Sequence, residues 1–461
     1  MAGGWGELLR GGNAQRSAVV GGGMVIHAIS TFIVTTILPT VVHDIGGLRF
    51  FAWSTTLYVV ASLLGGAGCA RLMARVGARG SYRAALGIFA LGAAVCALAP
   101  NMPALLIGRF IQGLGAGTLS ALSFTMVRTL FAETLWARAI SVVSAAWGVA
   151  TLAGPAVGGV FAQYHAWRLA FWMVFAAAPL LLALVERALP RDLARPPAPR
   201  GRMAWLNLGV LAASALCVSA GSSSPQVVWN VVGLAAAVGG FALFIRLEQG
   251  ARKLLPTGAC NPTVALGAAY AAMLTLIIGI TTEIFVPYFL QTLHGLVPLH
   301  AGYLSALMSG GWTTGSVGGA SLGPRGARTA MRSGPLAMAL GLAGLFVLMP
   351  APSAPIWPIG LCLAAMGLGI GLCWPHLGAS VFASAPERER DLAASSMTMV
   401  IMVSNALGSA LGGMVTNVAG LSVPGGAAGA TSAATWLFGA YVVSPLLAGL
   451  AVHRLLAAWA A

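Results

Sequence analysis

The chain alternates long apolar stretches with short segments that hold almost all of its charged residues. Each stretch approaches the ~20 residues that a helix needs to cross the hydrocarbon of a bilayer. Because no water satisfies backbone polar groups there, stretches of this kind must be helical. The sequence predicts fourteen spans, at residues 18–42, 52–72, 82–100, 103–127, 138–162, 167–188, 204–222, 228–247, 263–290, 301–323, 333–350, 357–381, 392–418 and 433–456.

The composition supports an integral membrane protein. Hydrophobic residues make up 58% of the chain and charged residues 8%, with a mean hydropathy of +0.87. This is more apolar than a soluble domain, which must cover its own surface. A net charge of +15 can indicate nucleic acid, but no basic patch with interleaved aromatic residues is present. The six cysteines show no metal-ligand spacing. We therefore expect no nucleic-acid partner and no metal.

The distribution of positive charge predicts the orientation. If the N-terminus is cytoplasmic, the only cations outside the inner segments are Arg49 and Arg168, in outer segments, and Arg109, within a span. The positive-inside rule demands such an asymmetry. Both termini are thus predicted to be cytoplasmic. The first span is too long for a signal-peptide core, so we expect it to remain as a helix.

Two segments carry unusual residues for a membrane helix. The fourth stretch reads Arg109-Phe-Ile-Gln112-Gly113-Leu-Gly115-Ala-Gly117, and an arginine in hydrocarbon costs ~2.5 kcal/mol or more unless it faces a polar interior. The fifth stretch reads Gly154-Pro155-Ala-Val-Gly158-Gly159. A glycine-rich face lets two helices approach closely, and proline bends one of them.

These segments resemble two signature motifs of the major facilitator superfamily of secondary transporters. The first resembles the Arg-x-x-Gln-Gly motif of the fourth helix, and the second the Gly-Pro-x-x-Gly-Gly motif that marks proton-driven antiporters. Trp53 and Tyr58 match a Trp/Tyr pair that opens the second helix in the fourteen-span drug:proton antiporter branch.

The loop after the second span departs from the family pattern. Arg75, Gly77 and Arg79 match its Arg-x-Gly-x-Arg part, but Ala74 replaces an aspartate that usually latches the two halves. Ser30 likewise stands where that branch carries an aspartate in its first helix. These departures favour the alternative of a metabolite importer or facilitator on the same fold.

An internal repeat supports two related halves. Gly113-Leu-Gly115-Ala-Gly117 recurs as Gly367-Leu-Gly369-Ile-Gly371, and Gly158-Gly159 recurs as Gly412-Gly413, both 254 residues further on. Arg75–Arg79 is echoed by Arg325–Arg328. The resemblance and the repeat together predict an all-α major facilitator fold, with two pseudo-symmetric six-helix bundles and two extra spans between them. The predicted division is a cytoplasmic N-terminus (1–17), the first bundle (18–188), a linker (189–203), the extra spans (204–247), a cytoplasmic loop (248–262), the second bundle (263–456) and a tail (457–461).

Proton coupling needs a group that loads and releases a proton within the membrane. Glu283 is the one acidic residue well inside a span, where an apolar environment disfavours its charged form; the alternative is a hydrated residue at the outer mouth. His27 lies on the same helix face as Ser30 and could replace the missing aspartate as proton acceptor, or could be a packing residue. Arg109 cannot titrate, so it would act electrostatically or hold neighbouring helices together.

The remaining candidates concern the substrate. An adaptable apolar cavity would be lined by polar and aromatic side chains on the spans, namely Gln112, Ser30, Trp147, Phe285, Tyr288, Trp312 and Trp374. Packing motifs are expected at Gly113, Gly117, Gly154, Pro155, Gly158, Gly159, Arg75, Gly77 and Arg79.

The resemblance implies a monomeric exporter of a small, mostly hydrophobic compound in exchange for protons, working by alternating access in a bacterial cytoplasmic (inner) membrane. A non-transporting membrane sensor or partner subunit is the alternative of another class. No cofactor is expected, since the sequence has no ATP-binding Gly-x-x-x-x-Gly-Lys loop, and no clustered catalytic groups suggest an enzyme.

Overall fold

The computed structural model describes residues 5–8, 10–190, 193, 204–224, 226–250, 253–320 and 322–458. Within them every regular element is helical, and the chain divides into two compact units. Unit 1 comprises the described residues up to Gly47 and those from Leu57 to the linker; unit 2 comprises Leu48–Thr56 and the described residues from Ala204 onward. The predicted linker, 189–203, lies mostly outside the described residues.

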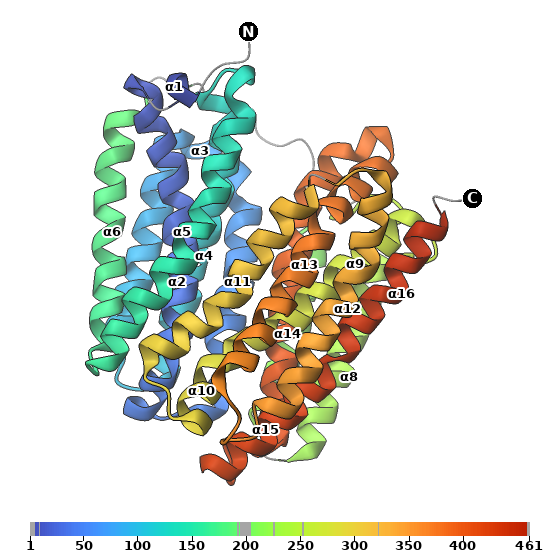
Figure 1. Cartoon of the computed structure of the whole chain (residues 1–461). Helices are drawn as coiled ribbons and strands as arrows, with labels where there is room; N and C mark the ends of the chain where they lie inside the picture. Colours follow the sequence, from blue (N-terminus) through green and yellow to red (C-terminus); the bar gives the residue numbers. More distant parts are fainter. Residues whose placement is uncertain are drawn as a thin grey trace. The chain divides into compact units, whose positions relative to one another are not determined.

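Unit 1 is built from six helices and one 3-10 turn (Figure 1). They are α1 (Trp5–Leu8), α2 (Gly11–Ile45), α3 (Trp53–Ala97), α4 (Met102–Leu130), η2 (Glu133–Leu135), α5 (Trp136–Gln163) and α6 (Trp167–Ala188). Helix α2 packs against α4, α5 and α6.

Helix α3 contains a change of direction at Gly77. That residue has φ 73° and ψ 179°, a backbone conformation that favours glycine and interrupts the helix. Just after it, Arg79 contacts the C-terminal end of α6, through Glu186. The end of α3 lies at the other end of α6, since Arg168 donates a hydrogen bond to the carbonyl of Ala99. Residues 53–97 therefore form two helical segments rather than one straight helix.

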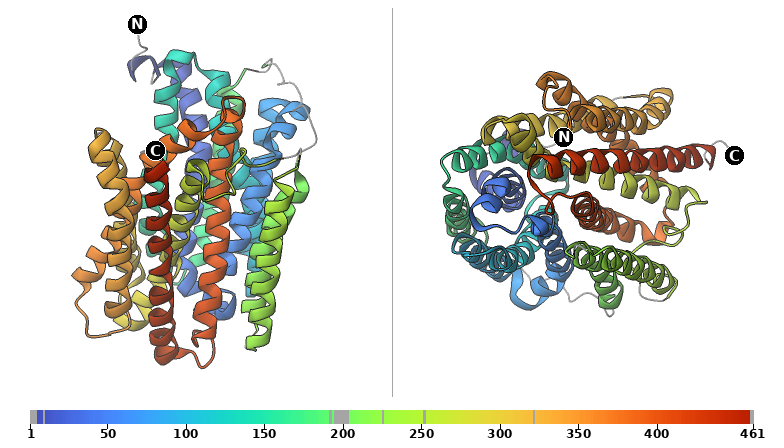
Figure 2. Two further views of the ribbon diagram at one scale, coloured as in Figure 1. Left: turned by 90° about the vertical axis from the view of Figure 1, so that its right-hand side faces the viewer. Right: turned by 90° about the horizontal axis from the view of Figure 1, so that it is seen from below.

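Unit 2 begins with a short segment, η1 (Leu48–Phe50), and the first turn of α3. Its other elements are α7 (Trp205–Ser222), α8 (Val227–Leu247), α9 (Ala265–Ile280), η3 (Thr281–Phe285), α10 (Val286–His294), α11 (Pro298–Ala320), α12 (Pro324–Leu348), α13 (Ile356–Ser384), η4 (Glu387–Glu389), α14 (Arg390–Val418), α15 (Gly426–Tyr441) and α16 (Val443–Ala458). Figure 2 shows α11, α12 and α13 side by side, in agreement with their contacts.

Helices α7 and α8 form a packed pair attached to α14. Val218, Ala237 and Ala410, one from each helix, form a buried apolar cluster. The indole nitrogen of Trp53 donates to the carbonyl of Ser219 (3.0 Å) and to the hydroxyl of Ser223 (2.8 Å). The extra helices are thus integrated into unit 2.

The number of apolar helices differs from the expected fourteen. Among the described residues, twelve helical stretches are long and apolar enough to cross a membrane. Two predicted spans merge because Leu48–Ala97 is one helical stretch of 50 residues. The helix α11 has 23 residues without a charge, but its glycines, serines and threonines make it less apolar than the other stretches. The predicted span 263–290 is found as one stretch, Ala265–His294, although η3 interrupts it between α9 and α10.

The glycine repeat predicted from the sequence corresponds to a repeated packing arrangement. A side-chain carbon at Gly113 or Gly117 would collide with the first segment of α3, and one at Gly115 with the second. In unit 2, Gly367 and Gly371 meet α11 in the same way, while Gly369 meets α12. Each unit therefore places one glycine-rich helix between two neighbours.

Candidate functional site

Arg109 is buried in the interior of unit 1, with 1% of its surface exposed. Close packing of α4 on the first segment of α3, made possible by Gly113, places its guanidinium against Tyr58. The Nη1 atom donates hydrogen bonds to Oε1 of Gln112 (2.6 Å) and to Oγ of Ser30 (3.3 Å). The guanidinium carbon lies 3.9 Å from the centroid of the Tyr58 ring, within the range of a cation–π contact. Neutral oxygens and an aromatic face therefore stabilise the buried charge.

His27 lies beside this arginine on α2 and is 3% exposed. The hydroxyl of Tyr58 is 3.2 Å from Nδ1 of His27 and donates to its backbone carbonyl at 3.1 Å. The two rings stack with centroids 5.7 Å apart. The structure thus brings together four predicted residues, His27, Ser30, Arg109 and Gln112, which with Tyr58 we call the polar cluster.

Sequence reasoning did not assign Tyr58 to the site. It was noted only for its match to the Trp/Tyr pair of the second helix. Its two partners are 31 and 51 residues away along the chain, on α2 and α4, so helical spacing could not reveal the contacts.

The Gly-Pro segment of α5 packs against the helix that carries His27 and Ser30. A side-chain carbon at Gly154 would meet Phe32, and one at Gly158 would meet Ile33 and Thr36. Pro155 lies inside the helix and Gly159 is buried. Gly154 and Gly158 therefore lie against α2, at the residues that directly follow His27 and Ser30.

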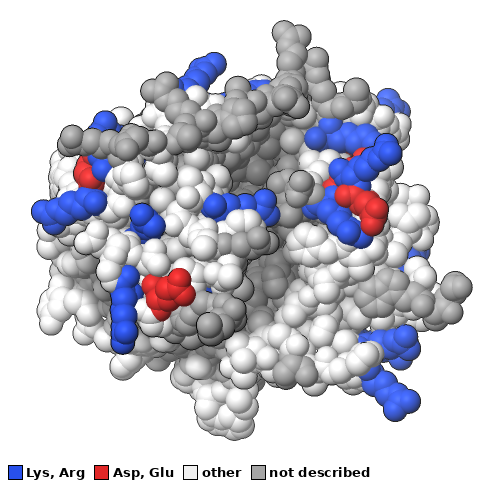
Figure 3. Space-filling model, turned by 90° about the horizontal axis from the view of Figure 1, so that it is seen from above, with Lys and Arg blue, Asp and Glu red and all other residues white. Residues whose placement is uncertain are grey.

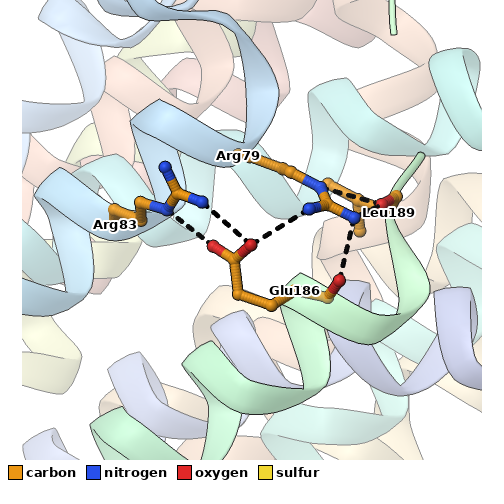
Figure 4. A network of polar contacts seen from close by, with 4 residues as sticks. All are labelled: Arg79, Arg83, Glu186 and Leu189. Carbon is orange, nitrogen blue, oxygen red and sulfur yellow. Dashed lines mark hydrogen bonds and ion pairs between the residues drawn. The ribbon is translucent and has the colours of Figure 1, made fainter. Parts of the chain in front are cut away.

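The loop after the first segment of α3 is tied to the end of α6 (Figure 4). Arg79 donates to Oε2 of Glu186 (3.0 Å) and to the backbone carbonyls of Glu186 and Leu189. Arg83 forms a bidentate pair with the same carboxylate, at 2.6 and 2.9 Å. Arg75 is exposed and takes no part in this network, which we call the Arg79 clamp.

Glu283 lies in unit 2, in the 3-10 break between α9 and α10. The hydroxyls of Thr281 and Thr282 donate to the carbonyls of Ile278 (2.6 Å) and Gly279 (3.1 Å), which partly satisfies the interrupted backbone. Helix α14 packs on this break, because a side-chain carbon at Gly408 would meet Thr281. The carboxyl is therefore carried by an irregular segment and not by a regular helix.

The predicted aromatic residues form two groups within unit 2. Phe51 lies between Phe285 and Tyr288, with ring centroids 5.4 and 5.5 Å away. Trp312 on α11 and Trp374 on α13 contact one another at 5.4 Å between centroids. The side chain of Trp147 lies outside the described residues. Contact of any of these residues with a substrate stays a prediction.

No group of three or more metal-ligating side chains occurs within the part of the chain that the structure describes. The polar cluster in unit 1 offers a fixed cation, an imidazole, hydroxyls and an amide, and the 3-10 break in unit 2 carries the carboxyl of Glu283. Each of these two groups, taken by itself, can bind a polar part of a ligand or exchange a proton.

Comparisons with known proteins agree with this architecture. The model of the Major Facilitator Superfamily matches residues 20–409. A probable multidrug-efflux transporter of Mycobacterium tuberculosis is 36% identical over 427 residues, which cover 90% of each chain. Multidrug resistance protein 3 of Bacillus subtilis is 25% identical over 405 residues, covering 86% of this chain and 78% of that protein.

Solved structures share the fold at low identity. A bacterial homologue of the human lysosomal transporter Spinster, inward-facing and unoccupied, has a TM-score of 0.67 at 15% identity and covers 96% of both chains. A D-xylose–proton symporter has a TM-score of 0.65 at 16% identity, covering 96% of this chain and 97% of that one. The family match extends over most of the apolar helices, and we conclude that this integral, multi-pass membrane protein belongs to the Major Facilitator Superfamily, a family of transporters rather than enzymes.

Proposed function

We propose that the chain exports a small, mostly hydrophobic compound, such as a drug, in exchange for protons. The observation that carries the proposal is the polar cluster, where a buried arginine and a histidine are held close together inside unit 1. The names of the relatives from Mycobacterium tuberculosis and Bacillus subtilis support export of drugs. The Gly-Pro segment of α5 supports coupling to protons through its resemblance to antiporters.

Fourteen spans with both termini in the cytoplasm are part of this proposal. The helical stretch Leu48–Ala97 would measure about 75 Å if it were straight, against a hydrocarbon core of about 30 Å. The contacts of Arg79 and Ala99 with opposite ends of α6 support two crossings within it. The packing of α11 on α13, which matches that of the first segment of α3 on α4, supports α11 as a further span.

The charge distribution supports the orientation. Figure 3 shows lysine and arginine side chains on the face seen from above. Cations gather on the cytoplasmic side of membrane proteins. We place this face in the cytoplasm of a bacterial cell, with the inner membrane around the helices. We also propose that the transporter works as a monomer. Its proposed domains are the two six-helix bundles, the linker and the two extra spans predicted from the sequence.

Glu283 is the proposed proton carrier, and the polar cluster is a second titratable centre. Glu283 lies in a 3-10 segment between two α-helices, and such a segment in the middle of a helix often marks a functional hinge. Arg109 would bias the protonation of its neighbours through its fixed charge. Ser30, Gln112 and the aromatic groups around Phe285 and Trp312 are the proposed substrate contacts.

The test is transport of a fluorescent lipophilic cation, such as ethidium, into proteoliposomes that carry a pH gradient. Accumulation should follow an acidic interior and stop when nigericin collapses the gradient. Transport that equilibrates ethidium but continues at the same rate without the gradient would contradict proton exchange. That result would favour the facilitator, for which the replacements at Ala74 and Ser30 provide the specific support. The absence of any flux would favour the sensor.

A further inference from the structure

Tyr58 contacts Arg109 and His27, two residues of the polar cluster, at once. Its ring lies under the guanidinium of Arg109 at 3.9 Å, while its hydroxyl lies 3.2 Å from Nδ1 and 3.1 Å from the carbonyl of His27. It is 1% exposed, so no bulk water competes for these contacts. One side chain on α3 thus connects α2 with α4.

The hydroxyl geometry limits how His27 can be protonated. A phenol has one hydrogen to donate, and a backbone carbonyl can only accept. If that hydrogen is given to the carbonyl of His27, Nδ1 must donate to the phenol oxygen to satisfy the second contact. If it were given to Nδ1 instead, the phenol oxygen and the carbonyl oxygen of His27 would face each other at 3.1 Å with no hydrogen between them, and the carbonyl would keep only its other donors, such as the hydroxyl of Thr31. The first arrangement satisfies both contacts, and in it the neutral imidazole carries its hydrogen on Nδ1.

We propose that Tyr58 is a positioning residue, which holds His27 in the Nδ1–H tautomer and seats Arg109 on its ring. A proton that reaches His27 then adds to Nε2 and leaves from Nε2, while Nδ1 keeps its hydrogen and its contact with Tyr58 throughout. The imidazole would not need to rotate on protonation. Use of this step in transport rests on the proposed function, but the tautomer itself does not.

Tyr82 provides a matched control. It lies on the second segment of α3 and is fully buried. Its hydroxyl has no hydrogen-bond partner among the described residues. Tyr82→Phe therefore removes the same atom as Tyr58→Phe from an equally buried ring, without removing a hydrogen bond.

The first experiment is nitrogen-15 NMR of protein labelled at histidine, since the two neutral tautomers give different nitrogen shifts. His27 is identified by the signals that disappear in His27→Gln. The wild type and Tyr82→Phe should show the Nδ1–H form, and Tyr58→Phe should shift toward the Nε2–H form. An Nε2–H signal in the wild type would overturn the proposal without any variant at Tyr58 having to fold. Identical His27 signals in Tyr58→Phe and the wild type would also overturn it.

The second experiment separates the ring from the hydroxyl in the ethidium assay. Tyr58→Phe keeps the ring and should slow proton-driven transport about fivefold, the effect of one hydrogen bond. Tyr58→Leu also removes the cation–π contact and should slow it about thirtyfold further. Equal transport rates for Tyr58→Phe and Tyr58→Leu would contradict the proposal that the ring of Tyr58 positions Arg109. A wild type that shows the Nδ1–H form but exchanges no protons would contradict the proposed function and leave the positioning role standing.

Discussion

Helices α4 and α13 are packed in the same way but carry different side chains. Each has three glycines with the same spacing, and each lies between two neighbours that approach these glycines closely. The positions of Arg109 and Gln112 on α4 correspond, 254 residues further on, to Leu363 and Met366, both fully buried. The packing is therefore repeated in the two units, whereas the corresponding positions carry a buried arginine and glutamine in unit 1 and apolar side chains in unit 2. This separates residues that maintain the fold from residues proposed to perform transport.

The largest effect that follows from this comparison is expected at Arg109. Arg109→Leu should reduce ethidium transport at least about a hundredfold, because it removes two charge-assisted hydrogen bonds and a cation–π contact. Leu363→Ala, at the corresponding position, should cost ~3 kcal/mol of stability and leave coupled transport in the folded fraction within threefold of the wild type. Initial rates normalised to folded protein measure both. Equal losses of transport in Arg109→Leu and Leu363→Ala would contradict the view that the polar residues of α4 serve transport while the corresponding residues of α13 serve packing.

The glycines should be equally important in both units. Gly117→Ala and Gly371→Ala should each lower the free energy of unfolding by ~2 kcal/mol, because the added carbon meets the backbone of Ser62 or Trp312. Titration with SDS in mixed micelles measures the change. Gly87→Ala and Gly310→Ala are the controls, since a side-chain carbon there meets nothing within 4 Å. If only one of these two substitutions lowered the free energy of unfolding, the repeated glycines would not have the same packing role in the two units.

The two related segments, Arg75–Arg79 in unit 1 and Arg325–Arg328 in unit 2, should contribute differently to the stability of the protein. Arg79→Gln should cost about 1 kcal/mol in the same titration, because the clamp joins α3 to the carbonyl end of α6. Arg328→Gln should change stability by less than ~0.5 kcal/mol, since Arg328 is exposed and has no ion pair within the described residues. If Arg328→Gln cost as much stability as Arg79→Gln or more, the stabilising role would not be specific to the Arg79 clamp.

The smallest expected effect is a pH dependence of stability at Glu389, in the short segment η4 between α13 and α14. The carboxylate of Glu389 accepts hydrogen bonds from the backbone nitrogen (2.5 Å) and the hydroxyl (2.8 Å) of Thr257, which lower its pKa below the usual value. Because the pKa is lower in the folded protein, this contribution is present above the unfolded value, about 4.3, and is lost as the pH falls through the folded value. The carboxylate is exposed, so we expect less than ~1 kcal/mol. The stability difference between the wild type and Glu389→Gln should shrink below pH 5, and a constant difference would be the contradictory result.

The sequence could predict those features that repeat along a helix or between the units. The spacing of Gly113, Gly115 and Gly117 indicated close packing, and the structure gives each of them a neighbouring backbone. His27 and Ser30 share a helix face, so their common orientation followed from their spacing.

Features that depend on contacts between distant segments could not be predicted. Arg79 and Glu186 are 107 residues apart, and nothing in either segment indicates the other. The break at Thr281–Phe285 lies inside the predicted span 263–290, where the sequence has no proline before Pro287. Pairing across helices and local backbone breaks depend on tertiary packing, which the periodicity of a single chain does not describe.

The most direct test of the proposed mechanism is proton release from purified, detergent-solubilised protein when a lipophilic cation is added. Wild-type protein should release protons on binding ethidium, because substrate and proton compete for the same state of the transporter. Glu283→Gln should bind ethidium without releasing protons, while Glu7→Gln, at a residue on the short first helix, should behave as the wild type. Full proton release in Glu283→Gln, or ethidium binding without proton release in the wild type, would contradict this account.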